Sequence, residues 1–441
     1  MNVGITATFT VVGLLALLLI GIPIAYVLGL TGIFGLFTAT GGTNAWLSLT
    51  SGATMHLSSS SLLAIPLFML MSAYITESGM GPKLLDFTDK WFSRLPGSLY
   101  NAALAACGAF STLSGSSVAT AGAIGGVVLP EFKRRGLNMR RGMGAVAAGG
   151  TLGVLIPPST AFIVYGELTE TSVARLFMAG VVPGILILAV FIVYTMVVSA
   201  AEERKTEPSE AAPDISWAAR WAALRQIWSA IVLMIAVLGG IFIGLVTPTE
   251  AAALGALAAM LIGVYVLKGL SWMDVHRAAV RSIYSITMIG TILLGGLILG
   301  RAITMLGISQ ELVDLIQGTG QPGWMVIIWI MLLLLFLGML MDGAAITVIT
   351  VPLLYPVITS YGYDPVWFAV IFVVNMEIGL ITPPVGMNLF IVKAISGEPM
   401  GEVIKGTLPY VLLMMIVLIM LIVFPQISLW LPNLLLPTYA S

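Results

Sequence analysis

Residues 153–162 read GVLIPPSTAF and place two consecutive prolines inside an otherwise apolar stretch. Each proline lacks a backbone N–H, and Pro158 disfavours helical geometry at Pro157. In a membrane, a backbone polar group without a partner costs several kcal/mol. The stretch therefore predicts a membrane helix that is broken where its freed carbonyl groups face a cation or other protein groups instead of lipid.

The composition predicts an all-α polytopic membrane protein. Of the 441 residues 59% are hydrophobic and 9% are charged, whereas soluble domains carry roughly 25% charged residues. Long apolar runs such as 227–246 and 325–340 recur along the chain, as helices surrounded by membrane lipid require. The two-residue alternation of a transmembrane barrel is absent from the sequence. A net charge of −1 argues against a nucleic-acid partner.

The double proline occurs twice, at a constant offset of 226 residues. Pro157 and Pro158 fall on Pro383 and Pro384, and other Gly and Pro identities share this offset. The polar segment 199–226 divides the two halves. We therefore expect a first repeat over 1–198, a cytoplasmic linker over 199–226 and a second repeat over 227–441. The further identities are Pro96–Gly97 on Pro322–Gly323, Pro130 on Pro356, Gly136 on Gly362, Gly153 on Gly379, Gly180 on Gly406, and Pro183 on Pro409.

Each repeat is expected to contain about five transmembrane helices, a re-entrant hairpin and a Pro-Pro broken helix. The hairpins are expected at about 98–132 and 323–358, because about 35 residues with a polar centre are too few for two spans of about 20 residues each. The broken helices are expected at about 142–166 and 366–392. Because a re-entrant hairpin does not cross the membrane, each repeat crosses it five times. This odd number inverts the second repeat relative to the first. With the first hairpin's flanks cytoplasmic, all of the 19 Lys and Arg residues except Arg175 and Arg301 lie on the cytoplasmic side, which places both termini outside.

Inverted repeats with hairpins and broken helices are typical of secondary transporters. The hairpin tips and breaks offer hydroxyl, carbonyl and carboxylate oxygens, which suit a hard ion such as Na⁺. His56 and His276 are too isolated to form any other metal site. The candidate residues are Ser114, Gly115, Ser116 and Ser117 with Thr151, Gly153, Pro157, Pro158 and Ser159 in the first repeat, and Asp342 and Gly343 with Asn375, Glu377, Gly379, Thr382, Pro383, Pro384, Gly386 and Asn388 in the second.

Four charged residues lie at or close to membrane depth, where charge is costly and commonly functional. These are Glu250, Arg301, Asp342 and Glu377. Asp342 is expected to complete an ion site or to relay a proton. Arg301 can pair with Asp342, meet an anionic substrate or extend to the outer interface. Glu250 reads as a first-turn carboxylate with a structural role.

The sequence does not favour an enzyme. It contains neither an HExxH motif nor a GxxxxGK[ST] phosphate-binding loop, and Asp342 is the only aspartate deep in an apolar segment. A stand-alone Na⁺- or H⁺-coupled anion carrier, or a channel lined by broken helices, remains an alternative.

Four segments resemble the large membrane subunit of tripartite ATP-independent periplasmic (TRAP) transporters, the DctM family. The motifs fall in the family's order and the resemblance covers essentially the whole chain. The segments are SGSSVATAGAIGGVVLPEF, GTLGVLIPPSTAFIVYGELTETSVARLFMAGVVPG, PTEAAALGAL and FVVNMEIGLITPPVGMNLFIV.

The resemblance implies Na⁺-driven import of organic acids across the bacterial inner membrane by an elevator motion, with Na⁺ as coupling ion and no cofactor. It implies two partners, a small DctQ-type membrane subunit, separate from this chain, and a periplasmic DctP-type binding protein that delivers substrate. One Na⁺ site would lie at Ser114, Gly153 and Pro158, and a second at Asp342, Gly379 and Thr382. Substrate would bind between the hairpin tips, at Ser116, Ser117, Ser159, Arg301, Gly343 and Asn388.

Overall fold

The computed structural model describes residues 3–42, 44–47, 49–50, 60–203 and 215–436, and within these ranges the chain forms helices and no strands. The predicted all-α architecture is confirmed. The helices are α1 (Val3–Leu19), α2 (Ile24–Thr40), α4 (Ser60–Glu77), α5 (Met80–Phe92), α6 (Ser98–Ser114), α7 (Ser117–Arg134), α8 (Met139–Leu155), α9 (Thr160–Thr169), α10 (Val173–Glu203), α11 (Trp217–Phe242), α12 (Pro248–Leu261) with the π-helix Ile262–Val266, α13 (Trp272–Met305), α14 (Ile308–Gly318), α15 (Gly323–Gly338), α16 (Gly343–Ser360), α17 (Pro365–Leu380), α18 (Met387–Ser396), α19 (Met400–Val423) and α20 (Gln426–Leu435).

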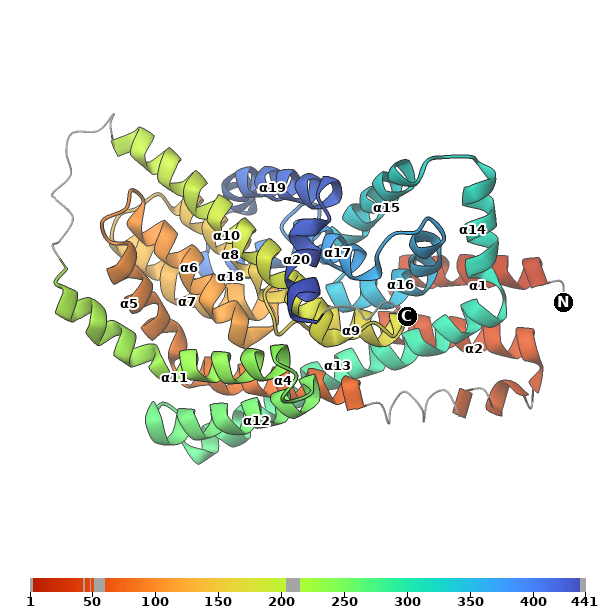
Figure 1. Ribbon diagram of the computed structural model, residues 1–441, viewed down its shortest axis with the longest axis horizontal. Coiled ribbons are helices and arrows are strands. Elements are labelled where there is room, and N and C mark those ends of the chain that lie inside the picture. The colour runs from red at the N-terminus through yellow and green to blue at the C-terminus, as the bar shows by residue number, and fades with distance from the viewer. Residues whose placement is uncertain (1–2, 43, 48, 51–59, 204–214, 437–441) are drawn as a thin grey trace.

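Five helices lie along the lower side of Figure 1, namely α2, α4, α11, α12 and α13, and α1 packs against α2. We call these six helices the scaffold layer. Helix α2 packs along α13, and α4 packs against both α12 and α13. Glycines permit the closest of these contacts. A Cβ on Gly32 would lie 2.6 Å from the backbone nitrogen of Leu299, so α2 and α13 meet almost backbone to backbone.

Helices α6 to α10 and α15 to α20 form the hairpin body, most of which lies above the scaffold layer in Figure 1. Its helices begin at equivalent places in the two repeats because polar N-caps are duplicated. Ser116 and Asp342 cap α7 and α16, and Asn138 and Asp364 cap α8 and α17. Each such side chain accepts a hydrogen bond from a first-turn amide, which fixes where the helix starts.

The two repeats exchange helices inside the hairpin body. Helix α7 of the first hairpin packs against α18, and in the equivalent contact α16 of the second hairpin packs against α9. Helix α17 lies at the centre, since every residue from Val366 to Leu380 is buried. The functional elements of both repeats therefore share one continuous core.

Two short amphipathic helices connect the scaffold layer to the hairpins. Helix α5 follows α4 and leads to α6, while α14 follows α13 and leads to α15. The chain bends by 70° between α4 and α5. We call α5 and α14 the arms. They lie at opposite ends of the long axis in Figure 1.

Seven helices in the described ranges are long and apolar enough to cross a membrane, or eight when α4 and α5 count as one bent span. Helices α1 and α2, with 17 residues each, are shorter apolar helices. The interval expected as a linker, 199–226, is partly helical, because α10 extends to Glu203 and α11 begins at Trp217. Of this interval, residues 204–214 lie outside the described part of the chain.

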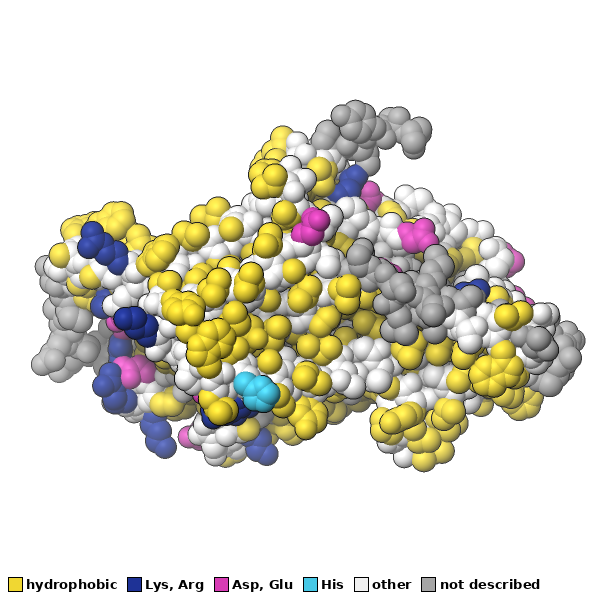
Figure 2. All heavy atoms as spheres, turned by 90° about the horizontal axis from the view of Figure 1, so that it is seen from below, with side chains coloured by type: hydrophobic (Ala, Val, Ile, Leu, Met, Phe, Trp, Pro, Cys, Tyr) yellow, Lys and Arg dark blue, Asp and Glu magenta, His cyan; other side chains and the backbone are white. Residues whose placement is uncertain are grey.

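Hydrophobic side chains cover the middle of the face seen in Figure 2, and Lys and Arg gather mainly towards one end of the long axis. In Figure 1 that end carries the arm α5. This distribution is typical of a membrane protein whose basic end faces the cytoplasm.

Candidate ion and substrate site

The tip of the first hairpin is a two-residue turn between α6 and α7. Gly115 ends α6 in the left-handed region, at φ +64°, which glycine adopts without strain. Ser116 caps α7 by accepting from the amide of Ala119, and the Ser114 hydroxyl donates to the carbonyl of Ser116 over 3.1 Å. The tip therefore presents hydroxyl and carbonyl oxygens at a helix N-terminus.

This tip packs against the break between α8 and α9. The Thr160 hydroxyl donates to the Gly115 carbonyl over 3.2 Å. A Cβ on Gly153 would lie 2.5 Å from the Ser116 oxygen, and a Cβ on Gly115 would lie 2.8 Å from the Pro158 oxygen. The structure thus brings the expected residues Ser114, Gly153 and Pro158 to one place, where the glycines allow carbonyl groups to approach closely.

In the second repeat the hairpin tip also packs against a broken helix, but the contacts are made by other groups. Asp342 caps α16 by accepting from the amides of Ala344 and Ala345 at 3.0 and 3.2 Å. The Met339 carbonyl at this tip accepts from the amides of Val385 and Gly386, which lie in the break between α17 and α18. Each hairpin tip is therefore hydrogen-bonded to the broken helix of its own repeat. Both Pro-Pro bonds in these breaks are cis.

Gly379 and Thr382 lie beside the second tip. A Cβ on Gly379 would lie 2.5 Å from the carbonyl carbon of Gly338, so α15 and α17 touch at this point. The Thr382 hydroxyl donates to the Ile378 carbonyl over 2.6 Å. Asp342 is half-buried. Its Oδ1 accepts both capping hydrogen bonds, whereas Oδ2 takes no part in the cap.

Both tips reach the same turn of α17. Ser117, the first residue of α7, donates from its hydroxyl to Oε2 of Glu377 over 2.6 Å. Gly343, the first residue of α16, faces Met376, whose sulfur would lie 2.6 Å from a Cβ on Gly343. Because Met376 and Glu377 are adjacent in α17, the expected substrate residues Ser117 and Gly343 come from opposite repeats to one small region.

Other expected substrate residues are buried or distant. Ser159 is fully buried and caps α9 by accepting from the amide of Phe162. Asn388 is fully buried and donates to the Ala147 carbonyl over 3.3 Å. Arg301 lies beside the middle of α16, since a Cβ on its neighbour Gly300 would lie 3.5 Å from Pro352. That position is about 14 Å along the axis from the start of α16.

Glu377 is the residue whose environment the sequence did not predict. Its position in an apolar segment marked it as unusual, but its partner Ser117 lies 260 residues away. The carboxyl is fully buried, and its Oε1 has no hydrogen-bond partner among the residues that the structure describes. The local pattern of polar residues offered no signal for this pairing, which requires the exchange of helices between repeats.

Two residues singled out from the sequence have other roles. Glu250 lies in the first turn of α12, where it forms a capping box with Thr247, a structural arrangement. His276 is exposed on α13, and His56 lies outside the described residues. In the ranges that the structure describes, His, Cys, Asp and Glu form no group of three or more that could hold a metal ion.

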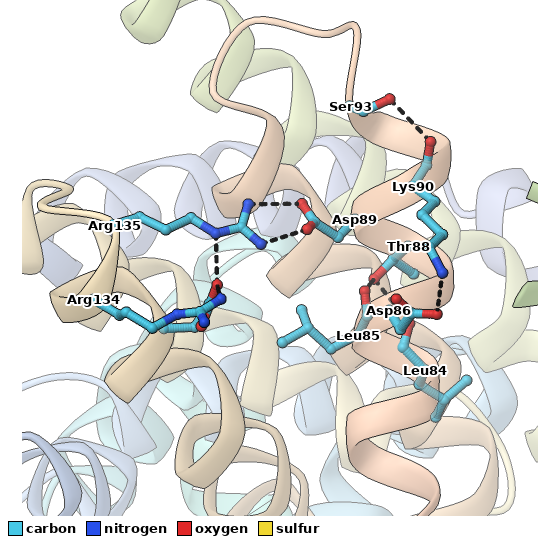
Figure 3. Close-up of polar contacts among 10 residues, drawn as sticks. Leu84, Leu85, Asp86, Thr88, Asp89, Lys90, Ser93, Arg134 and Arg135 are labelled. Atoms are coloured by element: carbon cyan, nitrogen blue, oxygen red, sulfur yellow. Dashed lines mark hydrogen bonds and ion pairs between the residues drawn. The ribbon is translucent and has the colours of Figure 1, made fainter. Parts of the chain in front are cut away.

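The base of the first hairpin is bonded to the arm α5 (Figure 3). Arg135 donates to Asp89 of the arm over 2.6 Å and to Glu131 of α7 over 2.6 Å. Arg134 also donates to Glu131. The hydrogen bond from Arg134 and, to a smaller extent, that from Arg135 hold the pKa of the Glu131 carboxyl below its ordinary value. The arm and the hairpin are thus joined by charge as well as by the chain.

The chain is similar to known proteins over most of its length. A family model described as "Tripartite ATP-independent periplasmic transporter, DctM component" matches residues 11–427. The chain is 37% identical to the C4-dicarboxylate TRAP transporter large permease protein DctM of Pseudomonas aeruginosa, covering 84% of this chain and 86% of that protein. It is 36% identical to the protein of the same name from Rhodobacter capsulatus, covering 96% of this chain and 98% of that protein.

A solved structure shows the same fold. It is the crystal structure of the Alcanivorax borkumensis YdaH transporter, with a TM-score of 0.64, 15% sequence identity, and coverage of 89% of this chain and 90% of that chain. At this identity the likeness concerns the arrangement of helices alone.

Proposed function

Because the chain belongs to the DctM family of tripartite ATP-independent periplasmic transporters, we propose that it is the subunit through which a Na⁺ gradient drives organic acids across the bacterial inner membrane. A periplasmic binding protein delivers the substrate, and a small DctQ-type membrane subunit braces the scaffold layer. The relatives named above are C4-dicarboxylate permeases, and a C4-dicarboxylate is the first substrate to test.

The approach of both hairpin tips to one turn of α17, at Met376 and Glu377, carries this proposal. Each tip places small residues and backbone oxygens beside a broken helix. Such irregular backbone is tolerated at membrane depth where it lies inside protein and binds an ion or substrate. We assign Na⁺ to Ser114, Gly153 and Pro158 at the first tip and to Asp342, Gly379 and Thr382 at the second.

The substrate carboxylates would bind between the tips. The helices α7 and α16 both begin there, and the N-terminus of a helix carries a partial positive charge that favours anions. Bound Na⁺ adds positive charge and holds each tip against the broken helix beside it. The substrate carboxylates would therefore bind more tightly when Na⁺ is bound, which couples substrate binding to Na⁺ binding. Arg301 would contribute only after a movement that brings α13 and the start of α16 together.

An elevator motion fits the two-part architecture. The scaffold layer packs through close helix contacts, and the hairpin body is attached to it by the arms α5 and α14. Movement of the hairpin body relative to the scaffold layer would carry the region between the tips from one side of the membrane to the other, while the arms change direction.

The test is uptake into liposomes that contain the large and small subunits, with the binding protein and a radiolabelled C4-dicarboxylate outside. We expect uptake only with an inward Na⁺ gradient and little or none without the binding protein. Robust uptake by this chain alone would indicate a stand-alone carrier. Ohmic current without substrate would indicate a channel and would overturn the proposal.

A further inference from the structure

The contact between Ser117 and Glu377 leaves a buried carboxylate incompletely satisfied. The Ser117 hydroxyl donates to Oε2 over 2.6 Å, and Oε1 has no partner. Hydrogen bonds from hydroxyl groups to ionised carboxylates measure about 2.5–2.7 Å. The contact between Ser117 and Glu377 is compatible with such a bond, and an ionised Glu377 would have one free oxygen that is fully enclosed in the protein.

Basic side chains on the neighbouring helices do not neutralise this charge. On α8, Arg140 pairs with Glu402 and Arg141 pairs with Glu202. Lys393 of α18 is exposed. Leaving a buried charge without a counter-ion costs several kcal/mol, so a cation beside Oε1 would remove a large penalty.

Two further buried oxygens near the start of α7 lack hydrogen-bond partners, Oγ1 of Thr120 and Oδ1 of Asn388. Their surroundings are placed by two glycines of α8. A Cβ on Gly150 would lie 3.1 Å from Nδ2 of Asn388 and 3.2 Å from the carbonyl oxygen of Ser117, and a Cβ on Gly153 would lie 2.6 Å from Oγ1 of Thr120. Glu377, Thr120 and Asn388 therefore lie near the start of α7, and each has one buried oxygen without a hydrogen-bond partner among the described residues.

We propose that Glu377 Oε1, Thr120 Oγ1 and Asn388 Oδ1 bind one further Na⁺ at the contact between the two repeats. This inference rests on the proposed use of Na⁺, but the three ligands differ from those assigned to the sites at the two tips. Oxygen-only ligands with one carboxylate suit a hard monovalent cation. One bound charge would neutralise the carboxylate and satisfy three buried acceptors together.

The origin of the ligands distinguishes this site from the two tip sites. Thr120 belongs to the first repeat, whereas Glu377 and Asn388 belong to the second. Each tip site uses residues of one repeat only. A cation held by Glu377 and Thr120 would therefore stabilise the packing of the first hairpin against α17 and α18. Occupancy of this site would depend on whether these helices are packed together.

The test measures equilibrium binding of ²²Na⁺ to the reconstituted complex of large and small subunits, without substrate, in choline or K⁺ buffer. We expect Glu377→Gln to bind one Na⁺ fewer per large subunit than the wild type. Glutamine keeps an acceptor for Ser117 but removes the charge. Thr120→Val, which removes one oxygen at nearly constant volume, is expected to keep the number of sites and to weaken one of them about tenfold, the effect of losing about 1.4 kcal/mol.

The matched control is Glu170→Gln, which neutralises an exposed carboxyl at the end of α9 and should bind as the wild type does. Unchanged number and affinity in both site variants would overturn the inference. A protonated-carboxyl infrared band at neutral pH that disappears in Glu377→Gln would also overturn it, because Glu377 would then hold a proton. A wild-type complex that binds no Na⁺ would overturn the proposed coupling together with this site.

Discussion

Gly144 of α8 and Gly406 of α19 lie in direct backbone contact, since a Cβ on Gly144 would lie 2.0 Å from the carbonyl oxygen of Gly406. The approach is tightened from the other side, because a Cβ on Gly406 would lie 2.0 Å from the carbonyl oxygen of Arg140. Real Cβ atoms cannot occupy such positions. The first repeat's broken helix is thus held against the last long helix of the second repeat by the absence of two side chains.

Gly144→Ala should destabilise the hairpin body by about 1–3 kcal/mol, because the added methyl group must push two helix backbones apart. Thermal unfolding of the purified protein measures the effect. The matched control is Gly126→Ala on α7, where no atom lies within 4 Å of the added Cβ. The control should be neutral or more stable by about 0.5–1 kcal/mol, as alanine usually is in place of a helical glycine.

Asp342 performs a capping role that can be separated from ion binding. Asp342→Asn keeps an acceptor for the amides of Ala344 and Ala345 but removes the charge, and asparagine caps helices about as well as aspartate. We expect normal thermal stability and loss of Na⁺-driven uptake. Asp342→Ala should lose uptake and also about 0.5–2 kcal/mol of stability. Wild-type uptake in Asp342→Asn would leave the residue a helix cap only.

Gly153→Ala should weaken Na⁺ binding at the first tip, because the new Cβ would lie 2.5 Å from the carbonyl oxygen of Ser116 and 2.6 Å from Oγ1 of Thr120. The tip would be displaced from the break. The apparent Na⁺ affinity of uptake should fall by at least about tenfold, corresponding to about 1.4 kcal/mol. Gly122→Ala is the control, since its Cβ would lie 3.9 Å from Ile391. Equal Na⁺ affinities in the two variants would contradict the assignment.

The Glu131 cluster predicts a pH dependence at the base of the first hairpin. Hydrogen bonds from Arg134 and Arg135 lower the pKa of Glu131 in the folded protein. A lowered folded-state pKa stabilises the protein above the unfolded value of about 4.3, and this stabilisation is lost as the pH falls through the folded value. The difference in Tm between wild type and Glu131→Gln should therefore be full at neutral pH and shrink in acid. A difference that grows in acid would contradict the sign.

The bond between the arm and the hairpin base should be weak in equilibrium terms. Arg135 and Asp89 are partly exposed, with side-chain exposures of 39% and 23%, and such pairs contribute about 0.2–1 kcal/mol. Asp89→Asn should change thermal stability by no more than this, and high salt should remove the difference. A substantially larger loss would show that the arm is held to the hairpin more firmly than its exposure implies.

The sequence predicted the repeated elements well because Gly, Pro and polar caps define helix ends locally. The hairpins expected at about 98–132 and 323–358 are occupied by α6–α7 and α15–α16, and the breaks fall at the prolines. Ser116 and Asp342 occupy equivalent positions and make equivalent caps. Such local signals survive in a chain where hydrophobicity is nearly uniform.

Contacts between the repeats could not be predicted in this way. The pairing of Ser117 with Glu377 depends on how two distant helices pack, and the same offset that relates the repeats places Gly343 and Thr151 at the equivalent positions, which offer no such pair. The position of Arg301 could not be predicted either, because only the packing of α13 places its neighbour Gly300 beside Pro352. The arms α5 and α14 were also absent from the predicted elements, since short amphipathic helices lack a membrane-span signal.

The reciprocal packing of α7 on α18 and of α16 on α9 also bears on ancestry. A polypeptide holding one repeat alone would leave each of these surfaces uncovered, and a second copy inserted in the opposite orientation would cover both. The duplicated chain therefore has the form of a fused antiparallel homodimer. Once the halves were fused, each could diverge separately, as the different residues at the equivalent caps Ser116 and Asp342 illustrate.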